Sequence, residues 1–213
     1  MSTNTPSDMP QPVASQTYLA LGDSYTIGEA VDENLRWPNQ LVDALNKEGY
    51  AWEAPRIIAR TGWTTNELQA AIKDAELKES YDWVSLLIGV NNQYRGYPMA
   101  QYEQELQALI ATALNFANGD AERVFMVSIP DYGVTPFAAN SDTDKIAREL
   151  DAYNAYAKAL CESKGILFVN ITDISREAKE DASLVASDEL HPSGAMYTRW
   201  VQERILPALK EKM

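Results

Sequence analysis

The chain has 213 residues, of which 46% are apolar and 23% are charged, the composition of an ordinary globular protein long enough to bury one large core. Its net charge is −13, from 18 basic and 31 acidic residues without a basic run. A surface for nucleic acid or for an anionic membrane is therefore excluded, because both require clustered lysine and arginine.

The first 16 residues are polar, contain Pro6, Pro10 and Pro12, and lack the basic and then apolar layout of a signal peptide. We expect residues 1–16 to be a disordered leader and residues 17–213 to form a single domain. No apolar run approaches the ~18 residues of a membrane span. We therefore expect no membrane insertion and a cytoplasmic location.

Short apolar runs alternate along the chain with longer amphipathic segments, which is typical of βαβ units and a parallel sheet. The runs rich in Val, Ile, Leu and aromatic residues predict strands at 17–21, 53–59, 83–88, 123–129 and 166–170. Helical periodicity and capping signals predict helices at 38–47, 64–75, 98–113, 144–163 and from 193 to the C-terminus. The predicted fold class is α/β, a three-layer α/β/α domain with roughly five strands and its active site at their carboxyl ends.

The single cysteine, Cys161, excludes an intrachain disulfide and falls on the apolar stripe of a predicted helix. A buried, inert thiol is the expected state of such a residue. Because the chain also has only one histidine, we expect no cysteine-based metal site.

Ser24 lies in Gly22-Asp23-Ser24, directly after the first predicted strand, and so belongs at a carboxyl edge of the sheet. A serine in a loop is weak evidence alone, because serine favours turns and helix caps for structural reasons. Thr26 stands where the G-x-S-x-G elbow of α/β-hydrolases requires glycine. Neither a phosphate-binding loop nor a dinucleotide fingerprint occurs in the chain.

The sole histidine, His191, is the one imidazole that could activate a serine hydroxyl. Asp188 precedes it by three positions, a spacing of one helical turn that places both side chains on the same side. Asp188 could then accept the Nδ1 proton of His191, fix its tautomer and stabilise the imidazolium. The alternative is a solvated loop histidine beside an incidental carboxylate.

Two further loops follow predicted strands and offer hydrogen-bond donors. Asn91 follows the strand that ends at Ile88, and its amide could stabilise a developing oxyanion. Gly62, between the second strand and its helix, allows the backbone to approach a ligand closely and to aim an N–H at it. Ordinary tight turns are the structural alternative at both places.

These four blocks resemble the SGNH, or GDSL-type, hydrolases, which are named for Ser, Gly, Asn and His in separate blocks. Ser24 lies in GDSYT, Gly62 in RTGWTT, Asn91 in GVNNQY and His191 in DELHPS, in the family's order. The resemblance implies a flavodoxin-like sheet, a serine ester hydrolase and no cofactor. It assigns Ser24 as nucleophile, His191 as general base and Asp188 as its orienting carboxylate. The implied oxyanion hole combines the backbone N–H groups of Ser24 and Gly62 with the side chain of Asn91.

The sequence departs from the family pattern at two positions. Tyr25 replaces the leucine of the GDSL name, and Asn92 stands where many relatives have aspartate. The first change does not touch the chemistry, whereas the second predicts a different contact behind the oxyanion hole.

The substrate is less sharply indicated than the mechanism. Aromatic residues near the expected site could stack on a sugar or an aromatic alcohol, although packing roles are common for such residues: Tyr25, Trp37, Trp63, Tyr94, Tyr97 and Tyr132. Arg95 is a candidate contact for a substrate anion. We favour a small-molecule carboxylic ester, with sugar O-deacetylation and lysophospholipid cleavage as alternatives.

A non-catalytic flavodoxin-like module that binds a nucleotide or flavin is the alternative from another class.

Overall fold

The computed structural model of the chain describes residues 15–213. The predicted leader falls mainly on residues 1–14, which lie outside the described residues. Gln16 forms an isolated parallel bridge with Trp52, and its N–H lies 2.6 Å from the carbonyl oxygen of Ala51. Residues 15 and 16 of the predicted leader therefore belong to the described structure, just before the first strand.

A five-stranded sheet forms the middle layer, and its strand order is β2-β1-β3-β4-β5 with every pairing parallel. The strands are β1 Tyr18–Gly22, β2 Arg56–Ala59, β3 Trp83–Leu87, β4 Val124–Val127 and β5 Leu167–Val169. All residues of β1, β3 and β4 are buried, which explains their nearly continuous apolar sequence. Residues 53–55 precede β2 instead of starting it, because Pro55 has no N–H to donate to a ladder.

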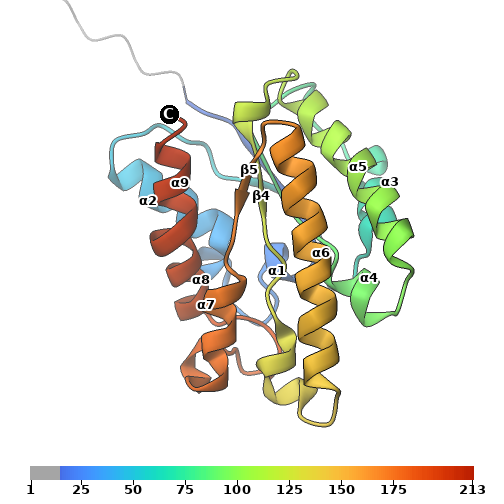
Figure 1. The fold of residues 1–213 in the computed structure, drawn as a ribbon. Helices are drawn as coiled ribbons and strands as arrows, with labels where there is room; N and C mark the ends of the chain where they lie inside the picture. The colour runs from blue at the N-terminus through green and yellow to red at the C-terminus, as the bar shows by residue number, and fades with distance from the viewer. Residues whose placement is uncertain (1–14) are drawn as a thin grey trace, which may run out of the picture.

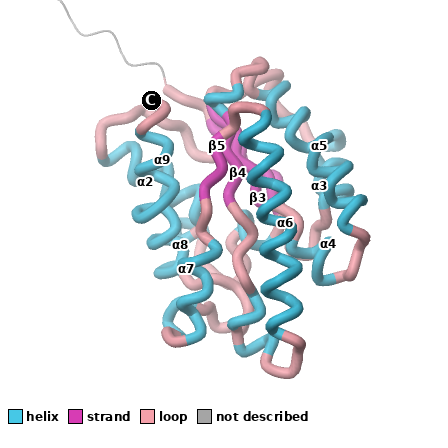
Figure 2. Tube along the Cα trace, viewed as in Figure 1, coloured by secondary structure: helices cyan, strands magenta, loops and turns pink. Residues whose placement is uncertain are grey.

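Helices cover both faces of the sheet, which confirms the predicted three-layer α/β/α fold (Figures 1 and 2). One face carries α2, α8 and α9, and the other carries α3, α5 and α6 (Figure 1). The helices are α1 Ser24–Ile27, α2 Trp37–Lys47, α3 Thr65–Asp74, α4 Val90–Tyr94, α5 Met99–Phe116, α6 Thr143–Ser163, α7 Thr172–Arg176, α8 Gly194–Trp200 and α9 Leu206–Lys210. Within residues 15–213, no helix combines the length and the apolar character needed to cross a bilayer.

The C-terminal helix differs from the single continuous helix expected from residue 193 onward. A wider π-helical turn, Val201–Ile205, separates α8 from α9. Pro207 lies at the start of α9 and has no N–H for the carbonyl four residues earlier, so the preceding turn widens.

The order in which successive strands are added to the sheet reverses between β1 and β3. From β1 it moves outward to β2, and it then returns past β1 to β3. In open parallel sheets, this switch point opens a crevice at the carboxyl ends of the two strands. Ser24 follows β1 and Asn91 follows β3 directly, so two of the predicted site residues flank that crevice.

Candidate active site

Four predicted residues from four separate segments line one cavity of about 140 Å³: Ser24, Gly62, Asn91 and His191. Ser24 begins α1 just after β1, Gly62 lies in the loop after β2, and Asn91 lies in α4 just after β3. His191 reaches the cavity from the loop before α8. The remaining lining residues are Tyr25, Thr61, Val90, Tyr94, Tyr132, Phe137 and Leu190.

Ser24 is the first residue of the short helix α1, and 4% of it is exposed. Asp23 caps this helix by accepting a hydrogen bond of 3.0 Å from the backbone N–H of Tyr25. Gly22 passes so close to β3 that a Cβ there would lie 2.5 Å from the carbonyl oxygen of Leu87. Only glycine fits this position between the backbone of β3 and the Thr26 side chain.

Asp23 is fully buried, and the burial raises the pKa of its carboxyl from 3.8 to about 7. Oδ1 accepts the capping hydrogen bond, whereas Oδ2 has no hydrogen-bond partner among the described residues. The Asp23 carboxyl, beside the candidate nucleophile, is therefore largely protonated below pH 7.

Asp188 binds His191 in the manner that the spacing predicted. Oδ2 of Asp188 lies 2.6 Å from Nδ1 of His191, and Oδ1 accepts the backbone N–H groups of His191 at 2.9 Å and Leu190 at 3.1 Å. Partial burial alone would raise the pKa of Asp188, but the hydrogen bonds from His191 and the backbone outweigh it and lower the pKa below 3.8. An ionised carboxylate in this position can accept a hydrogen bond from Nδ1 and so orient the imidazole.

The local structure around this pair is a loop and not the helical turn that the spacing suggested. Glu189 adopts a left-handed backbone conformation with φ +64°, which folds the chain back between Asp188 and His191. The loop is closed by an antiparallel bridge between Val185 and Pro192 and by a hydrogen bond of 2.7 Å from Ala186 N–H to the His191 carbonyl. The predicted contact is thus made through an aspartate turn.

His191 is buried to the same degree as the serine, with 6% exposed, and its ring lies edge-on to Tyr25 at a centroid distance of 5.6 Å. Within residues 15–213, no hydrogen bond joins Oγ of Ser24 to the imidazole, although both line the cavity. In unliganded enzymes such catalytic hydrogen bonds are often long and shorten only when substrate binds.

The Gly62 loop, residues 61–64, carries the second predicted donor. Gly62 has φ +86°, in the region that favours glycine, and an added Cβ would meet only ordinary contact with the Arg95 side chain. Glycine is therefore needed at this position for its conformation.

Asn91 and Asn92 join this loop to α4. Nδ2 of Asn91 donates to the Trp63 carbonyl at 2.9 Å, which leaves its second amide hydrogen for the cavity. Asn92 is fully buried, accepts the Thr65 N–H at 3.0 Å and donates to the Thr65 hydroxyl at 2.7 Å. Because an aspartate could not donate, this departure from the family pattern has a structural role.

The aromatic residues suggested by the sequence fall into three groups. Tyr25, Tyr94 and Tyr132 line the cavity, while Tyr97 lies farther out. Trp37 is fully buried in the core, so its role is packing. Trp63 is half-buried. Phe137 also lines the cavity and is 47% exposed. No sequence signal identified it, since it lies in a single 3₁₀ turn, Pro136–Ala138, which is too short for a periodic pattern.

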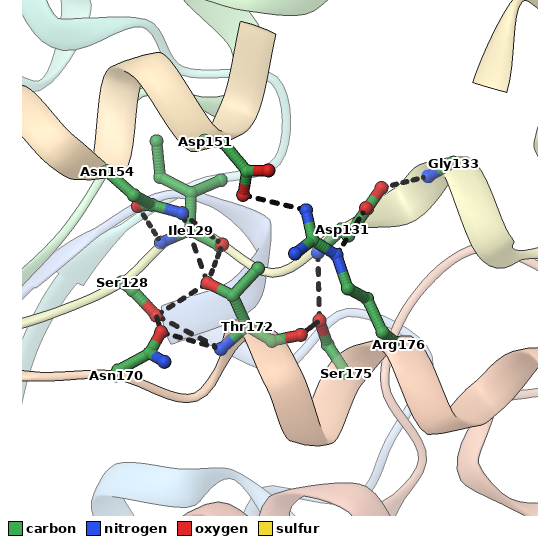
Figure 3. A network of polar contacts seen from close by, with 10 residues as sticks. All are labelled: Ser128, Ile129, Asp131, Gly133, Asp151, Asn154, Asn170, Thr172, Ser175 and Arg176. Atoms are coloured by element: carbon green, nitrogen blue, oxygen red, sulfur yellow. Dashed lines mark hydrogen bonds and ion pairs between the residues drawn. The ribbon is translucent and has the colours of Figure 1, made fainter. Parts of the chain in front are cut away.

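A polar network around the buried Asp131 side chain links the segment after β4 to α6 and α7 (Figure 3). The side chain of Asp131, 2% exposed, accepts Arg176 Nε at 2.9 Å and the Gly133 N–H at 2.9 Å. Arg176 also donates to Asp151 at 2.8 Å, and Ser175 accepts the Asp131 N–H at 2.9 Å. Tyr132, which directly follows Asp131, lines the cavity, so the network anchors the chain beside that wall.

An open groove of about 670 Å³ adjoins the cavity. Tyr94 and Tyr132 line both spaces, and their rings contact each other edge-to-face at 6.0 Å, so this pair forms the shared border. Charged and amide side chains lie along the groove together with tyrosines: Gln93, Tyr97, Asp142, Lys145, Glu149 and Tyr153. The groove is large enough for a drug-sized molecule.

Cys161 and Arg95 take no part in lining the cavity. Cys161 is fully buried on α6, and burial raises the pKa of its thiol to about 12, as expected for an inert cysteine. Arg95 donates to the Gly62 carbonyl at 2.6 Å and pairs with Glu67 at 3.3 Å. In residues 15–213, no three His, Cys, Asp or Glu side chains cluster as a metal site would require.

Solved structures of low sequence identity share this fold. TesA has a TM-score of 0.71 and 22% identity, and the match covers 93% of this chain and 100% of TesA. A variant of Axe2, an acetyl xylan esterase from Geobacillus stearothermophilus, has a TM-score of 0.70 and 21% identity over 92% of this chain and 96% of its own. These two similarities concern the architecture.

Sequence comparison identifies the family. The chain is 24% identical over 147 residues to an acetylxylan esterase of Geobacillus stearothermophilus, and the match spans 63% of each chain. The model of the GDSL-like Lipase/Acylhydrolase family matches residues 20–199, from β1 to α8. The chain belongs to the GDSL-like lipase/acylhydrolase family of ester hydrolases.

Proposed function

We propose that this family member cleaves small carboxylic esters through an acyl-enzyme on Ser24. The observation that carries the proposal is the cavity shared by Ser24, His191, Gly62 and Asn91, with the His191 ring held by Asp188 at 2.6 Å. Each residue comes from a different segment, so sequence proximity cannot explain their meeting at one strand-end crevice.

In the first step, Nε2 of His191 removes the Ser24 proton while Oγ forms a bond to the ester carbonyl carbon. The carbonyl electron pair moves onto oxygen, giving a tetrahedral oxyanion. When the bond to the alcohol oxygen breaks, the imidazolium returns its proton to that oxygen and the alcohol leaves. Water then repeats the sequence on the acyl-enzyme, releasing the acid and restoring Ser24.

The proposed oxyanion hole has three donors. The Ser24 N–H is at the first position of α1, where helix N–H groups have no partner within the helix. The Gly62 N–H comes from the loop after β2 and the second amide hydrogen of Asn91 from the start of α4, and both residues line the same cavity. Donors of this kind are typically worth ~10²–10³ in rate.

Among esters, a sugar O-acetyl ester is the favoured second candidate. A cavity of about 140 Å³ fits a small acyl group, whereas the adjoining groove of about 670 Å³ accepts a larger alcohol. Tyrosine rings beside carboxylates and an amide suit a hydroxylated, uncharged alcohol. Asp142 and Glu149 disfavour the phosphate of a lysophospholipid, with only Lys145 opposing them in the groove. The sequence match to an acetylxylan esterase supports the same class.

Hydrolysis of an ester panel by the wild type and by Ser24→Ala tests the proposal. We expect acetyl esters to be cleaved faster than long-chain acyl esters and the variant to lose at least about 10³-fold in kcat. Ser187→Ala is the matched control, because Ser187 is exposed and lies one residue before the histidine-binding Asp188. Retained turnover in Ser24→Ala would exclude Ser24 as nucleophile. A folded, inactive wild-type protein that copurifies with flavin would favour the binding module instead.

A further inference from the structure

The side chain of Arg95 acts on the oxyanion-hole loop. Arg95 immediately follows α4, and its Nη2 donates to the Gly62 carbonyl at 2.6 Å. Its Nη1 pairs with Oε2 of Glu67 at 3.3 Å, and Glu67 in turn closes the capping box of α3 by accepting the Thr64 N–H at 2.9 Å. Arg95 therefore connects the Gly62 loop to the first turn of α3 and to the end of α4.

Three side chains from one segment hold this loop and the first residue of α3. Asn91 donates to the Trp63 carbonyl, Asn92 binds the backbone and hydroxyl of Thr65, and Arg95 donates to the Gly62 carbonyl. Two of these three residues belong to the buried site, since Asn92 is fully buried and Asn91 lines the cavity. The contact of Arg95 is the one directed at Gly62 itself.

The orientation of the Gly62 N–H depends on the peptide that Arg95 binds. Gly62 has φ +86° and no Cβ, so its backbone has more conformational freedom than that of any other residue type. Fixing the carbonyl on one side of its Cα restricts the direction in which the N–H on the other side can point. An oxyanion donor must lie within about 2.7–3.1 Å of the developing charge, and small displacements are costly in rate.

We propose that Arg95 is a positioning residue that fixes the Gly62 peptide so that its N–H stays aimed at the oxyanion. The inference rests on the proposed function, in which Gly62 supplies one donor. It differs from the anion-binding role suggested by the sequence, because Arg95 does not line the cavity. A guanidinium suits this role, since it donates to the carbonyl and to Glu67 at once.

The kinetic test compares Arg95→Ala and Arg95→Lys with Arg60→Ala on a neutral acetyl ester. Arg60 is exposed and lies two residues before Gly62. Because Arg60→Ala removes the same positive charge as Arg95→Ala, it controls for a general electrostatic effect. We expect Arg95→Ala to lower kcat on the order of tenfold with KM nearly unchanged. Lysine can donate one hydrogen bond to the carbonyl, so Arg95→Lys should recover part of kcat. An equal loss in Arg60→Ala, or a loss confined to KM, overturns the proposal.

A spectroscopic readout does not depend on activity. The chain has ten glycines, so labelling with ¹⁵N-glycine gives a simple amide spectrum. In Arg95→Ala, the hydrogen of the assigned Gly62 amide should exchange faster with solvent, and its NMR signal should change position. It should be unchanged in Arg60→Ala, and distant Gly165 should be unchanged in both variants. An unaltered Gly62 amide in Arg95→Ala refutes the positioning role. A wild type without esterase activity, together with a perturbed Gly62 amide in Arg95→Ala, refutes the proposed function and leaves the contact of Arg95 with the loop established.

Discussion

Asp188 binds His191 with both carboxylate oxygens, one on the ring nitrogen at 2.6 Å and one on the backbone N–H at 2.9 Å. The left-handed backbone conformation of Glu189, between the two residues, allows both hydrogen bonds to form over so short a stretch of chain. The side chain therefore fixes the orientation of the imidazole and also the course of the loop that carries it. This double role sets the expected consequences of changing it.

Asp188→Asn should lower kcat by about 10²–10⁴-fold, because an amide in place of the carboxylate no longer fixes the tautomer or stabilises the imidazolium. The amide oxygen can still accept the backbone N–H groups, so the variant should fold. Initial rates with a soluble acetyl ester measure the loss, and circular dichroism checks the fold. Asp181→Asn, an exposed carboxylate that also caps a turn in this region, should retain wild-type kcat. Equal activity of the two variants would refute the role of Asp188.

Asp23 should make the protein less stable as the pH rises. Its pKa is about 7 in the folded chain and 3.8 ordinarily, so between these values the folded state binds the proton that the unfolded state has lost. The free energy of unfolding should therefore fall by roughly 2–3 kcal/mol from pH 5 to pH 8 through this group. Asp23→Asn resembles the neutral acid and keeps the cap to Tyr25, so it should remove this component. Urea unfolding at both pH values measures it, and parallel pH dependences for wild type and variant would contradict the assignment.

Arg176→Ala should destabilise the fold by about 1–3 kcal/mol, because it leaves the buried Asp131 carboxylate without its cationic partner. Arg204→Ala is a close control. Arg204 is 39% exposed and pairs at 2.8 Å with Asp173, which is 54% exposed, whereas Arg176 is 37% exposed and its partner Asp131 is 2% exposed. The control should cost less than about 1 kcal/mol. Denaturant unfolding distinguishes the two, and equal losses would show that burial of the carboxylate does not matter here.

Tyr94→Ala should broaden the ester selectivity, because Tyr94 forms the border between the cavity and the groove. At 59% exposed, the side chain contributes little to the core, so the variant should remain folded. We expect the ratio of kcat/KM for butyryl over acetyl esters to rise several-fold. Tyr97→Ala, which alters the groove alone, should leave that ratio near the wild-type value. An unchanged ratio in Tyr94→Ala would exclude the tyrosine as a limit on acyl size.

The sequence predicted the strands well because each buried strand is a short apolar run bounded by turn residues. It also placed Ser24 and Asn91 at the correct sheet edge, since both directly follow such runs. The helices α1, α4 and α7 escaped prediction because each has four or five residues, too few for a periodic pattern.

Contacts between distant segments were harder to predict. The backbone N–H of Phe137 donates to the Glu189 carbonyl at 3.1 Å, and Asp131 pairs with Arg176 across 45 positions. No local sequence pattern encodes either contact. Arg95 likewise meets Gly62 across 33 positions. The Asp188 and His191 pair could be predicted because three positions separate them, although the turn through Glu189 could not.

Labelling with a fluorophosphonate tests the central claim most directly, since the probe reacts covalently with an activated serine. Peptide mapping should place the label on Ser24 alone, and His191→Ala should abolish the reaction while Ser187→Ala leaves it intact. A folded wild-type protein that stays unlabelled, or a label on another serine, would contradict the assignment of Ser24 as the nucleophile.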